Sequence, residues 1–172
     1  FGYTGTITNG VAKRDPQFVD SGDAGNGVEC DNDGTGSSAQ PFTHPKLFNM
    51  ILVGPNVSTA LANHNLGLRF RRSTQFTMKN SVVWGWMKGG LSLESNETAQ
   101  FVKDGVSVFE NNSVGTFNPT LNFISKATTI LTSEQLKTLA LSKSNKEVDV
   151  VIPELDKPIW VNGWTRFPSK GN

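Results

Sequence analysis

The chain has 172 residues, and its 16 Lys and Arg side chains nearly balance 15 Asp and Glu side chains, giving a formal net charge of +1. This balance gives no electrostatic reason to expect a nucleic acid or an anionic membrane as a partner. No apolar run approaches the roughly 18 residues of a membrane-spanning helix, so we expect no membrane span in this chain. The 17 glycines and many polar residues are typical of one turn-rich β domain.

Short strands recur along the first two thirds of the chain. Gly27 begins a Gly-apolar-x-apolar pattern that returns at Gly67 and at Gly90. A second strand is predicted after each of them, over residues 47–53, 78–84 and 102–108. We align Asn49, Asn80 and Asp104 as equivalent corner residues of these second strands. The spacing indicates a repeat of about 23 residues, with insertions in the first unit.

A unit of this size, with short strands and polar turns, is typical of one rung of a parallel β-helix. Stacking the rungs predicts two inner columns and one outer row. Val28, Leu68 and Leu91 form the first column, Cys30, Phe70 and Leu93 form the second, and Glu29, Arg69 and Ser92 face outward. An antiparallel sandwich also uses short alternating strands and stays as the alternative fold.

Insertions and ends complete the expected domain. Loops are predicted over residues 31–44 and 55–65, and residues 5–12 resemble a truncated earlier rung. The rung pattern fades after Asn111. Thr132 and Gln135 form a capping box that predicts the only long helix, over residues 132–143, packed against the β-helix. We therefore expect β-helix rungs over residues 1–131, followed within the same domain by the helix and an extended tail over residues 132–172.

Several segments support a resemblance to a family. Residues 27–33, 41–54 and 67–86, with the ending Trp160-Val161-Asn162-Gly163-Trp164-Thr165, resemble secreted and cell-surface β-helix proteins of Bacteroidetes, mostly hypothetical outer-membrane lipoproteins. The resemblance implies an all-β, right-handed parallel β-helix on an exported protein. It implies no established activity. Because the family members are longer and this chain begins at Phe1, we expect a C-terminal fragment.

Candidate metal ligands lie in an acidic segment after the first strand. Glu29, Asp31 and Asp33, followed by Gly34, have the spacing of the first oxygen ligands of a calcium loop. The alternative is a solvated acidic turn. Ca²⁺ is therefore the only candidate ion, and we expect no other cofactor. With one cysteine and two histidines, the sequence excludes an intrachain disulfide and a Cys-rich or multi-histidine metal centre.

Candidate carbohydrate-binding residues come from a basic cluster and from an aromatic pair. Arg69, Arg71 and Arg72 are predicted to bind a carboxylate or sulfate, or to pair with Glu94. Alternation around Gly85 predicts that Trp84 and Trp86 lie on one face, where they could stack on a sugar or simply belong to the core.

Two function classes follow from these residues. The first is a non-catalytic adhesive or glycan-contacting protein, located outside the cell or on its surface. The second is a carbohydrate-active enzyme, a polysaccharide lyase or a glycosidase, which the same fold often carries. Too few rungs are present for the long substrate groove of such an enzyme, so we favour the non-catalytic class with a polysaccharide or other glycan as partner.

Overall fold

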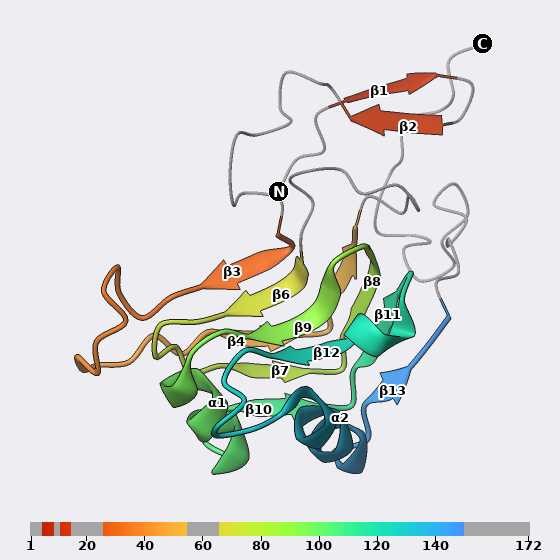
Figure 1. Cartoon of the computed structure of the whole chain (residues 1–172). Helices are drawn as coiled ribbons and strands as arrows, with labels where there is room; N and C mark the ends of the chain where they lie inside the picture. Colours follow the sequence, from red (N-terminus) through yellow and green to blue (C-terminus); the bar gives the residue numbers. More distant parts are fainter. Residues whose placement is uncertain (1–4, 9–10, 15–25, 55–65, 150–172) are drawn as a thin grey trace.

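The computed structural model describes residues 5–8, 11–14, 26–54 and 66–149. Three parallel sheets wrap around one apolar core (Figure 1). Sheet 1 contains β3 (Val28–Cys30), β6 (Leu66–Phe70), β9 (Gly89–Leu93) and β12 (Phe123–Ser125). Sheet 2 contains β4 (Lys46–Phe48), β7 (Thr77–Lys79) and β10 (Val108–Glu110). Sheet 3 contains β5 (Ile51–Val53), β8 (Val82–Trp86), β11 (Ser113–Thr116) and β13 (Lys146–Glu147).

The chain passes from sheet 1 to sheet 2 to sheet 3 and then returns to sheet 1 one strand further along the stack. This order of parallel strands is that of a β-helix, which confirms the predicted fold class and excludes the antiparallel sandwich. No helix among the described residues is long and apolar enough to cross a membrane.

The predicted inner columns are confirmed by the strand register. Leu68 of β6 lies opposite Val28 of β3 and Leu91 of β9. Phe70 lies opposite Cys30 and Leu93 in the same way. Phe70 is fully buried and stacks on Phe76, with ring centroids 3.9 Å apart. The three glycine-led strands are therefore equivalent strands of successive rungs.

Glycine is required in these strands because sheets 1 and 3 approach each other closely. A Cβ atom on Gly67 would collide with Val83, and one on Gly90 would collide with Val114. Both valines are fully buried. The glycines let the valines fill the corner between the two sheets.

The third corner residue and the repeat length were predicted wrongly. Asn49, Asn80 and Asn111 share a left-handed backbone, with φ of 56°, 55° and 55°, and Asn111 donates a hydrogen bond to Asn80 across 31 positions. Asp104 instead caps the end of α1 (Asn96–Lys103). The strand predicted over residues 102–108 is therefore wrong: β10 begins only at Val108, and the third rung carries an inserted helix. The 23-residue spacing holds only between Leu68 and Leu91.

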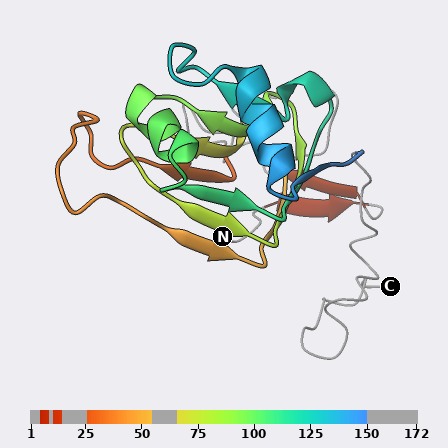
Figure 2. The same cartoon turned by 90° about the horizontal axis from the view of Figure 1, so that it is seen from below.

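The expected capping helix is confirmed as α2 (Ser133–Ser142), with Thr132 and Gln135 bonded reciprocally in the capping box. Leu136 and Ala140 are buried in the core, and Leu139 packs against it. It is not the only helix, since α1 precedes it, and both lie outside the stack of strands (Figure 2).

Two further expectations about the ends of the stack were wrong. β1 (Gly5–Thr8) and β2 (Val11–Arg14) pair antiparallel and so do not form a parallel rung. The rungs also continue beyond Asn111, through β11, a 3-10 turn at Pro119–Leu121, β12 and β13. The predicted loop over residues 55–65 and the tail from residue 150 onward lie outside the described residues.

Candidate functional site

The candidate site lies on the outer face of sheet 1. Glu29, Arg69, Ser92 and Ile124 occupy equivalent positions on β3, β6, β9 and β12. Their neighbours in sequence point into the core, because side chains alternate along a strand. The four residues form an outer row across the sheet, as predicted for the first three.

Ion pairs connect Glu29 and Arg69 of this row with Glu94 and Lys126, which directly follow β9 and β12. Arg69 contacts Glu94 at 2.9 Å through Nε and Glu29 at 3.5 Å through Nη1. Lys126 Nζ contacts the other oxygen of Glu94 at 2.7 Å. The prediction that an arginine of this cluster pairs with Glu94 is confirmed for Arg69.

The other two arginines extend the same network toward the loop after β3. Arg71 contacts Glu29 at 2.5 Å and Asp31 at 2.6 Å. Arg72 contacts the second oxygen of Asp31 at 3.0 Å. Each of the three predicted arginines therefore contacts an internal carboxylate.

Glu94 is the centre of the network. Its side chain is only 7% exposed and accepts hydrogen bonds from Arg69 and from the Ser92 hydroxyl. Burial raises the pKa of the Glu94 carboxyl, but the hydrogen bonds from Lys126 and Arg69 together outweigh burial and lower it. Glu94 is consequently ionised at neutral pH.

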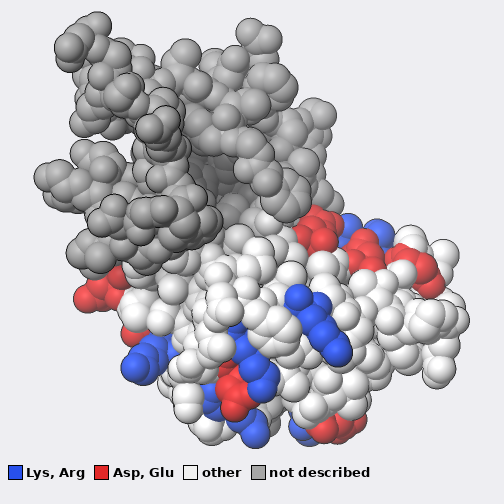
Figure 3. Space-filling model, turned by 180° about the vertical axis from the view of Figure 1, so that it is seen from behind, with Lys and Arg blue, Asp and Glu red and all other residues white. Residues whose placement is uncertain are grey.

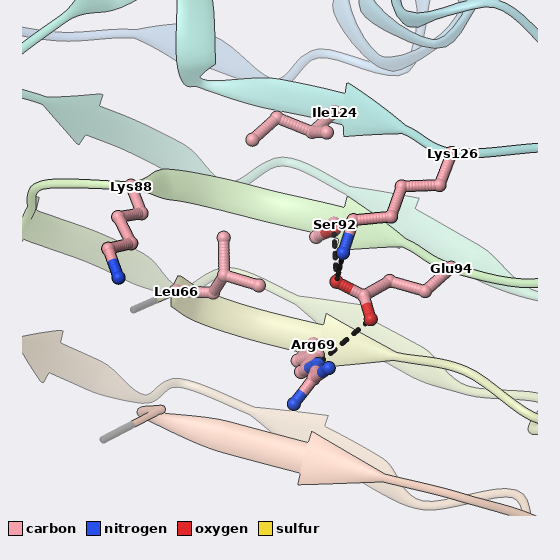
Figure 4. A pocket seen from close by; sticks show the side chains of 7 residues that line it. All are labelled: Leu66, Arg69, Lys88, Ser92, Glu94, Ile124 and Lys126. Carbon is pink, nitrogen blue, oxygen red and sulfur yellow. Dashed lines mark hydrogen bonds and ion pairs between the residues drawn. The ribbon is translucent and has the colours of Figure 1, made fainter. Parts of the chain in front are cut away.

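A pocket of about 260 Å³ opens beside Glu94 on this face (Figure 4). Leu66 and Ile124 give it an apolar middle. Lys88 lies at one end, whereas Glu94 and its cationic partners lie at the other. The lining residues are Leu66, Arg69, Lys88, Ser92, Glu94, Ile124 and Lys126. An apolar centre between polar ends suits a ligand that has both an apolar surface and hydroxyl groups.

Charges of both signs also lie side by side elsewhere on the molecule. The face seen from behind shows basic and acidic side chains interspersed (Figure 3). On the outer face of sheet 2, Lys79 contacts Glu110 at 2.6 Å, and this hydrogen bond lowers the pKa of the Glu110 carboxyl. That pair provides a comparison for the pairs on sheet 1.

The predicted tryptophan pair does not share a face. Gly85 has a φ of +73°, and the register with β11 shifts between Trp84 and Trp86. This bulge reverses the alternation, so that Trp86 is 6% exposed and belongs to the core, whereas Trp84 is half-buried. Both are on β8 of sheet 3, so the structure does not bring them together with the arginines of sheet 1.

The three candidate calcium ligands are also directed to different partners. Glu29 and Asp31 contact arginines. Asp33 accepts hydrogen bonds from the side chains of Ser37 and Thr35 and from backbone N–H groups of its own loop, and these bonds lower its pKa. Within the described part of the chain, no group of three Asp, Glu, His or Cys residues is arranged to hold a metal ion. A Ca²⁺ site at these residues stays a prediction.

Sequence reasoning missed the residues that β12 contributes. Ile124 lies across from Ser92, and Lys126 contacts Glu94, but the sequence pattern predicts that the rungs fade after Asn111. Asn111 follows Asn80 by the same 31 positions that separate Asn80 from Asn49, and this repeat of the corner is the sequence signal that a further rung follows.

The comparisons with known proteins agree with this architecture. Residues 1–165 match the family model of the pectate-lyase like beta helix domain. The chain belongs to this family. No curated protein and no solved structure matches the chain. Family membership confirms a parallel β-helix relationship, while the expected Bacteroidetes origin and lipoprotein nature stay predictions.

Proposed function

We propose that this chain acts at the cell surface after export and contacts polysaccharide without cleaving it, through the outer face of sheet 1. The observation that carries the proposal is the pocket between Leu66 and Ile124, with ionised and hydroxyl groups at its rim. Sugar rings have apolar C–H faces and polar edges, and this arrangement complements both. The pectate-lyase like family supports a role toward glycans.

Of the three arginines predicted to bind carbohydrate, only Arg69 lines this pocket. Arg69 lines the pocket, whereas Arg71 and Arg72 support its rim through Asp31 and Glu29. Trp86 serves the core and does not contact ligand.

A non-catalytic role is favoured by the ionisation state of Glu94. A general acid in glycoside cleavage needs a raised pKa, but the pKa of the Glu94 carboxyl is lowered by Lys126 and Arg69. Arg69 is ion-paired with two carboxylates, so its guanidinium has a structural role on this face, which opposes a role as the base of a lyase.

Binding by isothermal titration to a panel of oligosaccharides tests the proposal. Ile124→Ser removes half of the apolar middle of the pocket and should weaken binding at least about tenfold, the effect of losing roughly 1.4 kcal/mol. Val108→Ser is the matched control, because Val108 lies on β10 of sheet 2 beside the buried Phe109 and outside the pocket. No binding by the wild type, or equal losses in both variants, would contradict the proposal.

An enzyme is the second candidate, because Glu29 and Glu94 both contact Arg69, which places two carboxylates and an arginine on one face. Incubating the protein with the polysaccharides it binds, and measuring new reducing ends and unsaturated products, separates the two functions. Turnover abolished by Glu94→Gln would replace the binding role with a catalytic one.

A further inference from the structure

We infer that the pocket on sheet 1 selects neutral sugars over acidic ones, and that Glu94 determines this selectivity. The inference rests on the proposed glycan-binding function and specifies its ligand class. It differs from the expectation, based on the arginines alone, that this face binds a carboxylate or sulfate.

The first step is the state of the cations at the rim. The two that lie beside Glu94 hold its two oxygens separately, Arg69 at 2.9 Å and Lys126 at 2.7 Å. Glu94 thus fills the place between two cations that a ligand carboxylate would need.

The second step is the effect of displacing Glu94. Its side chain is 7% exposed, so a carboxylate that lost both cations would stay largely buried and unpaired. Removing one partner of a buried charge pair is strongly unfavourable. An acidic ligand at this end of the pocket would therefore have two options, both unfavourable. It would have to displace Glu94 from its cations, or it would have to lie beside the negative charge of Glu94.

The third step concerns the rest of the pocket. Lys88 lies at the opposite end, so a carboxylate near Lys88 would not reach Arg69 and Lys126 as well (Figure 4). A neutral sugar needs no displacement. Its hydroxyl groups can donate to Glu94 or accept from Lys88, while its apolar face covers Leu66 and Ile124.

The experiment uses a matched pair of probes, an oligomer of galacturonic acid and the same oligomer fully methyl-esterified, each titrated against the whole chain. The wild type should bind the neutral ester at least about tenfold more tightly than the acid. Glu94→Gln removes the negative charge that Arg69 and Lys126 share and should abolish or reverse this preference. Glu94→Asp keeps the charge and should keep the preference.

Glu110→Gln is the matched control, because Glu110 is ion-paired with Lys79 on sheet 2 and lies outside the pocket. In this variant, the ratio of the affinity for the methyl ester to the affinity for the acid should equal that of the wild type. Tighter binding of the acid by the wild type, or an unchanged ratio in Glu94→Gln, would overturn the selectivity while leaving the glycan role in place. Failure of the wild type to bind either probe or any neutral oligosaccharide would instead overturn the glycan role.

Discussion

The corner at which the chain enters sheet 3 and the connection that follows sheet 1 differ in how regularly they repeat from rung to rung. The chain enters sheet 3 by a turn at Asn49, Asn80, Asn111 and Ser144, each with a left-handed backbone. The three asparagines follow strands of sheet 2, whereas Ser144 follows α2. Where sheet 1 leads toward sheet 2, the connection is a loop over residues 31–45, a short turn over residues 71–76, or a segment carrying α1. One corner is repeated closely, whereas the other connection differs in every rung.

Hydrogen bonds between rungs explain the constancy of the corner. The Asn112 side chain accepts from the backbone N–H of Ser81 at 2.9 Å, and Asn145 accepts from Asn112 at 2.8 Å. An insertion at one corner would leave a buried donor in the neighbouring rung without its acceptor. The connection after sheet 1 is also bonded between rungs, for example from the Phe76 N–H to the Ser107 hydroxyl at 3.1 Å, but its length differs from rung to rung. It supplies Asp31, Arg71 and Lys126 to the candidate site. A solenoid can thus vary its binding face while one corner holds the rungs in register.

The largest expected effect comes from the core that both turns enclose. Phe70→Ala should lower the free energy of unfolding by about 3–5 kcal/mol, because it removes a fully buried ring stacked on Phe76. Urea unfolding measures this loss. Phe48→Ala is the control, since Phe48 is 47% exposed and its loss should stay below about 1 kcal/mol. Similar losses in the two variants would contradict the assigned inner column.

Breaking the constant corner is the next test. Asn112→Ala should cost about 2 kcal/mol, because it leaves the N–H of Ser81 and the carbonyl of Met78 without their partner. Asn96→Ala changes the same residue type at an exposed position and should stay within about 0.5 kcal/mol. An Asn112→Ala protein as stable as the control would show that the corner does not hold the rungs together.

The ion pairs of Glu94 on sheet 1 should make the free energy of unfolding depend on pH. The folded-state pKa of Glu94 is lowered from its ordinary value of 4.5, so its pairing stabilises the fold above that pH and is lost as the pH falls below it. At pH 7, Glu94→Gln should cost on the order of 2 kcal/mol. Unfolding of both proteins at pH 7 and at pH 3 should show the difference shrinking in acid. A difference that grows on acidification would contradict the assignment.

The smallest expected loss of stability comes from the connection that follows β12 of sheet 1 and carries α2. Thr132→Ala removes the capping box of α2 and should cost about 1 kcal/mol. Thermal unfolding should show the loss, while Thr129→Ala, at an exposed threonine outside the helix, should shift the midpoint little. Equal midpoints for the two variants would mean that the cap contributes nothing to the fold.

The constant and variable parts of the rung also differ in how well the sequence predicts them. Gly67, Leu68 and Phe70 repeat a pattern that their counterparts share, so the register of sheet 1 follows from the sequence. Residues 102–108 alternate in the manner of a strand, and this obscured the helix that Ser95 begins as N-cap. Alternation of apolar and polar residues within one short segment does not show where an inserted helix ends and the next strand begins.

The candidate site was predicted only in part, because some of its residues follow the repeat and others do not. Arg69 lies on β6 and Glu94 directly follows β9, two strands whose register follows from the repeat, and the sequence predicts their pairing. The separation of Trp84 from Trp86 depends on a bulge at Gly85, which is visible only against the neighbouring strand. Lys126 entered the site through a rung that the sequence pattern did not reveal.

Mapping a bound oligosaccharide by amide chemical shifts tests the central claim most directly. Titrating a neutral oligosaccharide into ¹⁵N-labelled protein should move the amide signals of Ser92, Glu94 and Lys126 on sheet 1. Signals of Lys79 and Glu110 on sheet 2 should stay in place. Shifts confined to sheet 2, or no shifts at saturating sugar, would contradict the assignment of the outer face of sheet 1 as the glycan-binding surface.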